Sequence, residues 1–301
     1  MRIVGVLNRD SGTLRTLDAE AFAAAAVLRF AEAGHRLECR LVTGAEIEAA
    51  LRLAAADPAT DVVLAGGGDG TISTAAGICF FANKPLAVLP LGTMNLFARS
   101  LRLPLEPVAA VAALATGTLH RVDIATANGR PFVHQFAVGF HSRLVRIREG
   151  LPYRNRWGKM VASLRALIEA LNRPLSFAVE LHSAAGIERR RAAALSVSNN
   201  VLGPGPVPFA EALDRGRLGV YVVAPMRPFA LAQLLMRFAY GQWQSHPLVS
   251  VESVTALTLV FPRRKARVHA VIDGELVPLE RRYDLAIHAG GLQVLAPPPA
   301  D

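Results

Sequence analysis

The chain has 301 residues, which is enough for two domains with sizeable buried cores. Its 52% hydrophobic and 19% charged residues are typical of a globular protein and exclude an intrinsically disordered one. No run of about 18 uncharged apolar residues occurs, so we expect no membrane-spanning helix, and Arg9 and Asp10 interrupt the first apolar run too early for a signal peptide. The net charge of +9 favours anionic partners: nucleotide phosphates, acidic lipids or nucleic acid.

Residues 1–120 alternate strand-like and helix-like patterns. Strands are predicted at 2–8, 37–42, 61–65 and 86–91, and helices at 18–34, 45–56 and 72–82, the first of them capped by Asp18. A further loop and helix are predicted at 92–101. Repeated strand–helix units with short connections predict a parallel sheet with helices on both faces. Binding sites in such sheets lie beyond the carboxyl ends of the strands.

The pattern changes near residue 118. Asn128-Gly129 lies between two alternating runs, which is a strong signal for a β-hairpin. Further strands are predicted at 175–182, 187–198, 217–223, 253–261, 267–272 and 283–296, and helices at about 157–172 and 227–241. We therefore predict a three-layer α/β domain over residues 1–120 and an antiparallel β-rich domain with added helices over 121–301. Whether the tail after Gly291 returns to the first domain is left open.

The first glycine loop is Gly66-Gly67-Gly68-Asp69-Gly70-Thr71, between a predicted strand and a helix. Glycines let backbone N–H groups approach an anion, and the helix N-terminus adds partial positive charge. We expect a side chain at 67, 68 or 70 to block that approach. Asp69 suits a phosphate site only with a cation between, which the Mg²⁺ carried by ATP would provide. The P-loop and dinucleotide fingerprints both fail here, and a tight turn without ligand is the alternative.

The second glycine loop is formed by residues 90–99, PLGTMNLFAR, and again follows a strand and opens a helix. Thr93 can cap that helix, and its hydroxyl or the Asn95 amide can face the same crevice as the first loop. Capping without ligand binding is the alternative. Two such loops on neighbouring strands predict a shared site.

The two loops together resemble the diacylglycerol kinase catalytic-domain family, through GGDGT at 67–71 and PLGTxN at 90–95. That family groups bacterial lipid kinases with sphingosine and ceramide kinases, and it shares a superfamily with NAD kinases and phosphofructokinases. Residues 7–12, with Asn8 and Ser11, are similar to the family's N-P-x-S-G loop, and 132–145 to the segment that opens its second domain. Asp273-Gly274-Glu275 is similar to its late D-G-E.

The resemblance implies an ATP-dependent lipid kinase. Residues 1–120 would be its nucleotide-binding, catalytic domain and residues 121–301 its lipid-substrate domain, with ATP and Mg²⁺ bound between them. It places the phosphates on loop 66–71, with Asn8, Ser11, Gly92, Thr93 and Asn95 nearby, and gives Asp69 a part in holding the metal. Glu275, with Asp273 beside it, would approach a lipid alcohol such as diacylglycerol. A carboxylate that takes the hydroxyl proton contributes roughly 10²–10⁴ in rate. The alternative for residues 273–275 is an ordinary turn.

Three positions depart from the family pattern. Ser73-Thr74 stands where Asn-Glu is usual, and Leu96 where an acid is usual. Asp214-Arg215-Gly216 replaces a D-D-G segment associated with a structural Mg²⁺, which leaves Asp214 as the candidate ligand. The alternatives are therefore an NAD kinase-like enzyme and a non-catalytic nucleotide- or lipid-binding descendant.

Two predicted helices, 157–171 and 226–243, combine apolar residues with basic ones, as an interfacial helix does. Packing against a sheet is the alternative for both. The basic run 263–267 suits an anionic headgroup or a solvated hairpin. We expect a cytoplasmic protein at the inner face of an anionic membrane, without nucleic acid because no aromatic residues interleave the basic run; a homodimer is left open.

The remaining candidate ligands are interpreted as structural. Cys39 and Cys79 lack metal or redox spacing and are expected to be buried thiols in a reducing compartment. His134 and His141 have no partners at metal-binding spacing.

Overall fold

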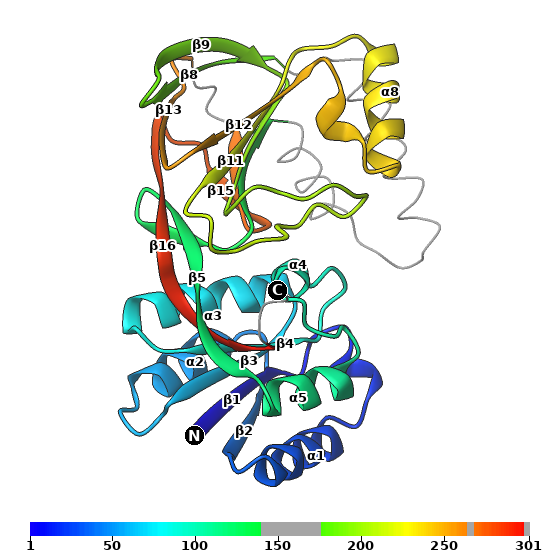
Figure 1. Cartoon of the computed structure of the whole chain (residues 1–301), viewed down its shortest axis with the longest axis vertical. Helices are drawn as coiled ribbons and strands as arrows, with labels where there is room; N and C mark the ends of the chain where they lie inside the picture. Colours follow the sequence, from blue (N-terminus) through cyan, green and yellow to red (C-terminus); the bar gives the residue numbers. More distant parts are fainter. Residues whose placement is uncertain (140–175, 264–267, 298–301) are drawn as a thin grey trace.

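The computed structural model describes residues 1–139, 176–263 and 268–297. Two hydrophobic cores lie one above the other in Figure 1, with the helix-rich half below and the β-rich half above. The predicted helix at 157–172, His141 and all of the basic run except Arg263 lie outside the described residues.

The lower half is built on a parallel sheet in the order β2-β1-β3-β4. Its strands are β1 (Arg2–Asn8), β2 (Arg36–Val42), β3 (Val62–Gly67) and β4 (Leu86–Pro90). The last two strands are buried along their whole length, as continuous aliphatic runs in covered parallel sheets are. Helices α2 (Ile47–Ala56) and α3 (Asp69–Ala82) pack side by side, and α1 (Ala19–Glu32) packs beside α5 (Pro107–Ala115).

The N-terminal ends of α1 and α5 test two helix-start signals in the sequence. Asp18 accepts a hydrogen bond from the Ala21 N–H at 3.0 Å, so the predicted cap of α1 is confirmed. Helix α5 was not predicted, although Glu106 accepts from the N–H groups of Val108 and Ala109 and Pro107 occupies the first turn.

Two long strands, β5 (Thr118–Ala127) and β16 (Arg282–Ala296), carry the chain between the two cores (Figure 1). They pair antiparallel, and the end of β16 also pairs in parallel with β4 through Val294 and Leu86. The tail after Gly291 therefore enters the lower sheet. Through β16 the sheet continues into β13 (Ala256–Val260), β8 (Phe177–Ser183) and β9 (Gly186–Ala192).

The upper half adds a second sheet in which every pairing is antiparallel, in the order β12-β11-β10-β7-β14-β15. Its strands are β7 (Gln135–Gly139), β10 (Ala194–Ser198), β11 (Leu218–Val223), β12 (Val249–Val254), β14 (His269–Ile272) and β15 (Glu275–Pro278). Helix α8 (Pro228–Ala239) lies to one side (Figure 1). The predicted α/β fold class with a second, antiparallel β-rich part is confirmed.

Two predicted strands were wrong in one respect. The segments 187–198 and 253–261 are each divided, at Ala193 and Thr255, into strands that belong to different sheets. Both sides of each break are rich in strand-forming residues, so the pattern contains no sign that the chain crosses from one sheet to the other.

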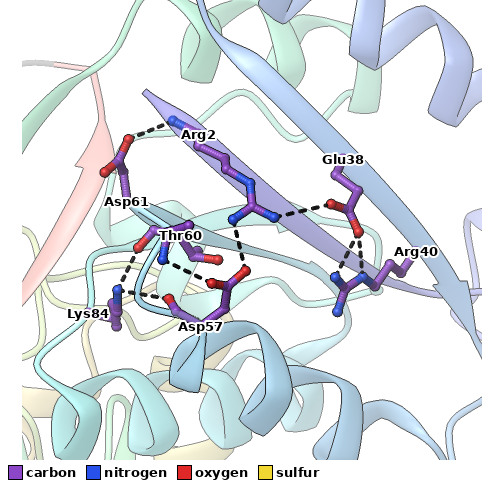
Figure 2. A network of polar contacts seen from close by, with 8 residues as sticks. Arg2, Glu38, Arg40, Asp57, Thr60, Asp61 and Lys84 are labelled. Atoms are coloured by element: carbon purple, nitrogen blue, oxygen red, sulfur yellow. Dashed lines mark hydrogen bonds and ion pairs between the residues drawn. The ribbon is translucent and has the colours of Figure 1, made fainter.

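A polar network closes the amino-terminal edge of the parallel sheet (Figure 2). The Arg2 N–H donates to Asp61 at 2.6 Å and the Arg2 guanidinium to Asp57 at 2.8 Å. Lys84 donates to the carbonyl oxygens of Thr60 and Asp57. This edge is at the opposite end of the sheet from the glycine loops. We therefore assign these charged side chains a structural role, which is to hold together the loops that lead from each helix into the next strand.

Within the described residues, none of the helices has the length and apolar character needed to cross a bilayer.

Candidate functional site

The loops that follow β1, β3 and β4 meet at the carboxyl edge of the parallel sheet. The Asn8 side chain lies 3.4 Å from the Thr71 hydroxyl, which links the first loop to the GGDGT segment. The Thr13 N–H donates to the Leu91 carbonyl oxygen at 3.2 Å, which links it to the second glycine loop. The structure therefore brings together loops 8–13, 66–71 and 91–95, as expected for parallel strands.

Three glycines of these loops are required by packing. A Cβ at Gly66 would lie 2.4 Å from the Leu7 side chain, and one at Gly67 would lie 2.5 Å from Thr71. A Cβ at Gly92 would lie 2.5 Å from the Gly68 Cα, since the two glycine loops touch backbone to backbone. Gly67 thus has a steric reason within the loop, apart from the expected approach of an anion.

Gly68 and Gly70 have no such reason. A Cβ at Gly68 would meet its nearest atom at 3.6 Å, and one at Gly70 would meet nothing within 4 Å. Neither has a positive φ that only glycine adopts readily. Nearby in the N-terminal loop, Ser11 Oγ is buried without a hydrogen-bond partner among the described residues. Free space over backbone N–H groups and an unsatisfied hydroxyl fit an anionic ligand such as a phosphate.

Asp69 joins the two glycine loops. It lies in the first turn of α3, and its carboxylate accepts from the N–H groups of Asn95 at 3.1 Å and Leu96 at 2.6 Å. These donors open α4 (Leu96–Ser100), so Asp69 caps a neighbouring helix. The expected cap by Thr93 was wrong: the N-cap residue is Asn95, and the exposed Thr93 makes no such bond.

Asn95 stabilises the second loop from within. It is buried at a positive φ of 51°, and its amide donates to the Gly92 carbonyl oxygen and accepts from the Gly92 N–H, both at 2.9 Å. Asn tolerates the left-handed conformation better than most residues. The Asn95 side chain therefore holds the loop backbone in place.

Asp273 connects α3 with the second sheet. Its carboxylate accepts from the Ser73 hydroxyl at 2.7 Å and from the N–H groups of Val133, His134 and Gln135 at 2.8–2.9 Å. It is only 8% exposed, at a positive φ of 46°. Four accepted hydrogen bonds match the lone-pair sites of a carboxylate, so Asp273 is suited to positioning its neighbours.

Glu275, two residues later, is exposed and forms an ion pair with Arg130, which follows the Asn128-Gly129 turn. Both residues border an open groove of about 570 Å³ lined by α2, α3 and β6 (Arg130–Phe132). The predicted acid of the D-G-E segment therefore has access to solvent at a cavity, whereas Asp273 does not.

His134 lies between the two halves of the site. Burial lowers the pKa of the His134 imidazole, and the nearby negative charges of Asp273 and Asp69 oppose that effect in part. The net effect favours the neutral imidazole. Its electrostatic interaction with both aspartates places it close to the glycine loop and to the D-G-E segment.

Asp214 is exposed, and no group of three or more His, Cys, Asp or Glu side chains suited to a metal occurs among the described residues. Two residues after Asp214, the Gly216 N–H donates to Asp123 at 2.6 Å. Asp123 is 1% exposed and also accepts from the Asn200 amide and the Gly290 N–H. Sequence reasoning missed Asp123, although a lone acid in the apolar strand VDIATA is a recognisable signal.

The second candidate membrane segment is partly described. Helix α8 and its C-cap residue expose large apolar side chains at Phe229, Met236 and Tyr240. The first candidate, 157–171, lies outside the described residues.

Comparison with known proteins gives the same family as the motifs. Residues 2–127 match the family model described as "Diacylglycerol kinase catalytic domain". A diacylglycerol kinase of Staphylococcus saprophyticus is 41% identical over 81 residues, 26% of this chain and 27% of that protein. A diacylglycerol kinase of Staphylococcus aureus is 27% identical over 252 residues, 75% of this chain and 74% of that protein. The chain thus spans about a quarter of the length of the first curated relatives it matches.

A crystal structure of a diacylglycerol kinase from Bacillus anthracis superposes with a TM-score of 0.74 at 18% identity, covering 99% of this chain and 97% of that one. At this identity the likeness supports the fold. The family match over residues 2–127 confirms the resemblance carried by the glycine loops. Residues 2–127 thus match the diacylglycerol kinase catalytic-domain family that the motifs indicated.

Proposed function

We propose that this protein transfers the γ-phosphoryl group of ATP to the hydroxyl of a lipid alcohol such as diacylglycerol. The observation that carries the proposal is the contact between Ser73 and Asp273. Ser73 is four residues after Asp69 on α3, which is about 6 Å along a helix axis. The first glycine loop and the turn that carries Asp273, which are remote in sequence, thereby contact α3 one helical turn apart.

The nucleotide phosphates would lie over Gly68 and Gly70, where the chain leaves free space above the start of α3. The Ser11 hydroxyl and the Asn8 amide border the same loop. Mg²⁺ in such sites is usually held by one or two carboxylates together with phosphates and water, and would neutralise phosphate charge. Asp69 supplies one carboxylate with lone pairs left after its two N–H bonds, so the residues present fit this ion.

Glu275 would act as the general base. A base must be accessible to the acceptor and within hydrogen-bond reach of its proton. Glu275 is exposed at the groove, while the saturated Asp273 carboxylate fixes the turn from which it projects. In this proposal Asp273 positions Glu275, and Glu275 accepts the hydroxyl proton.

The acceptor would be taken from a membrane surface. Phe229, Met236 and Tyr240 are exposed on or next to α8, and Arg227 and Arg237 flank them. An apolar face with basic neighbours suits the boundary between anionic headgroups and acyl chains. The net charge of +9 favours the same surface.

The test is a phosphorylation assay with the full chain, labelled ATP, Mg²⁺ and vesicles that contain diacylglycerol and phosphatidylglycerol. We expect a labelled lipid from the wild-type protein and a 10²–10⁴-fold lower kcat for Glu275→Gln, with the KM for ATP retained. Glu280→Gln, an exposed acid beyond the same hairpin, is the matched control. Undiminished turnover by Glu275→Gln would remove the base assignment, and labelling of added NAD in place of lipid would show an NAD kinase.

A further inference from the structure

We infer that the groove between α2 and α3 holds an acyl chain of the acceptor lipid while its hydroxyl lies at Glu275. This inference rests on the proposed function and names the path by which the substrate reaches the base. The groove volume of about 570 Å³ is within the range of small-ligand sites.

The groove is polar at one end and apolar at the other. Ser73, Thr74, Arg130 and Glu275 line it near the D-G-E segment. Farther along α3 the lining changes to Gly77, Ile78, Phe81 and Ala82, and α2 adds Ala55 and Ala56 together with the charged Glu48 and Arg52. From Thr74 to Ala82 the distance is roughly 12 Å along the helix axis. A molecule with a hydroxyl headgroup and a hydrocarbon tail matches this order.

Phe81 is the first specific feature of the apolar end. Its side chain is 71% exposed within the groove, although the ring of Phe80 beside it packs against His288. A large exposed aromatic side chain in a concave surface favours an apolar occupant.

Gly77 is the second and independent feature. It lies inside α3, where glycine lowers helix stability relative to alanine. A Cβ there would meet only Pro131, at an ordinary 3.7 Å, and its φ is not positive. Neither packing nor backbone conformation requires glycine at 77. A ligand that crosses the helix at this point would require the space.

Thr74 stands where a glutamate is usual in the family, so the wall of the groove carries no charge at this position. Its hydroxyl donates to the Gly70 carbonyl oxygen at 3.0 Å, so it presents a methyl group and a satisfied hydroxyl. The ionic groups that remain, Arg130 with Glu275 and Arg52 with Glu48, are paired with one another. An uncharged acceptor such as diacylglycerol therefore meets no unpaired charge from these residues.

The direct test is photo-crosslinking, which needs no turnover. The full chain is irradiated with vesicles that contain a diacylglycerol with a diazirine at the end of one acyl chain, and the labelled peptides are identified by mass spectrometry. We expect labels within residues 47–56 and 69–82. Labels confined to other segments, such as α8, would overturn the inference whether or not the protein phosphorylates lipids.

Two variants test the same groove by kinetics. Gly77→Leu fills it and Phe81→Ser removes its apolar wall, so we expect each to raise the KM for dioctanoylglycerol at least tenfold and to lower the crosslinking yield, with the KM for ATP unchanged. Ala25→Leu and Leu28→Ser make matching changes on the exposed face of α1 and serve as controls.

The two proposals fail separately. Labelled peptides from α2 and α3 in a protein that shows no kinase activity would support the acyl-chain groove and contradict the proposed function. If the protein phosphorylates lipid but Phe81→Ser and Leu28→Ser have the same KM for dioctanoylglycerol, the proposed function stands and the acyl-chain groove is contradicted.

Discussion

Two aspartates in this protein use their carboxylates to bind main-chain donors from other parts of the chain. Asp69 accepts from the first N–H groups of α4, and Asp273 accepts from three consecutive N–H groups before and within β7. Hydrogen bonds to an ionised group are about twice as strong as those between neutral groups. Each aspartate therefore fixes a loop that the proposed chemistry needs.

Replacement of Asp69 by Asn tests this loop-fixing role. The Asn95 and Leu96 N–H groups bind different oxygens of the carboxylate, and an amide keeps only one of these acceptors. We therefore expect the free energy of unfolding to fall by about 1–2 kcal/mol. Hydrogen exchange of the Leu96 amide should accelerate. Asp18→Asn is the control, because Asn is as good an N-cap as Asp for the single Ala21 bond. Unchanged Leu96 exchange would contradict the assignment.

The two cysteines provide a prediction of pH dependence. Burial raises the pKa of the Cys39 thiol to about 11 and that of the Cys79 thiol to about 12. Since the thiolate is the reactive form, native protein should react slowly with a disulfide reagent at pH 8, without an inflection near the unperturbed value of about 8.5. Unfolding in guanidinium should restore that inflection. An inflection below pH 9 in the reaction rate of the native protein would contradict the raised pKa of the buried thiols.

The residue-level interpretation succeeded where a motif was contiguous. The glycine loops, the Asp18 cap and the Asn128-Gly129 hairpin are all local signals, and the structure shows each element where they predicted it. Ser73, Arg130 and Asp123 were not found, because each acts through a partner that is remote in sequence: Asp273, Glu275 and the Gly216 and Gly290 backbones.

At the scale of elements, the contact between the two glycine loops sets how closely β3 and β4 can approach at their carboxyl ends. Gly92→Ala would place a methyl group 2.5 Å from the Gly68 backbone, which cannot move aside as a side chain can. We expect a loss of about 1–3 kcal/mol in the free energy of unfolding. Gly77→Ala, in an open part of α3, should instead gain about 0.5–1 kcal/mol. Urea denaturation of both variants checks the difference in sign.

Strand divisions could not be predicted at this scale. Residues 187–198 and 253–261 have continuous strand composition, but the chain changes sheets within each. Sheet membership is decided by which neighbours pair, and such pairs are far apart in sequence, as Leu195 with Val138 and Leu259 with Leu181 are. Helix α5 differs, since Glu106-Pro107 is a local start signal that was available.

At the scale of the whole molecule, β16 completes the lower core after passing through the upper one. Its last residues pair with β4 and β5, and Val294 and Leu295 are completely buried. Each such side chain contributes about 1.5–3 kcal/mol by burial. A chain that ends at Gly291 should lose at least about 6 °C in the midpoint of thermal unfolding. Removal of residues 298–301 alone is the control, and equal midpoints would contradict the structural role of the strand.

The ribbon of β5 and β16 contains a bulge. The register shifts between His288 and Leu292, and Gly290 has a positive φ of 59°. The Asp123 carboxylate accepts from the Gly290 N–H at this point. It also accepts from the Gly216 N–H, which lies in the loop before β11. Bulges bend a strand and increase its twist. Since the backbone crosses between the halves along this ribbon, bending of one half against the other would act on the bulge, which the Asp123 carboxylate anchors.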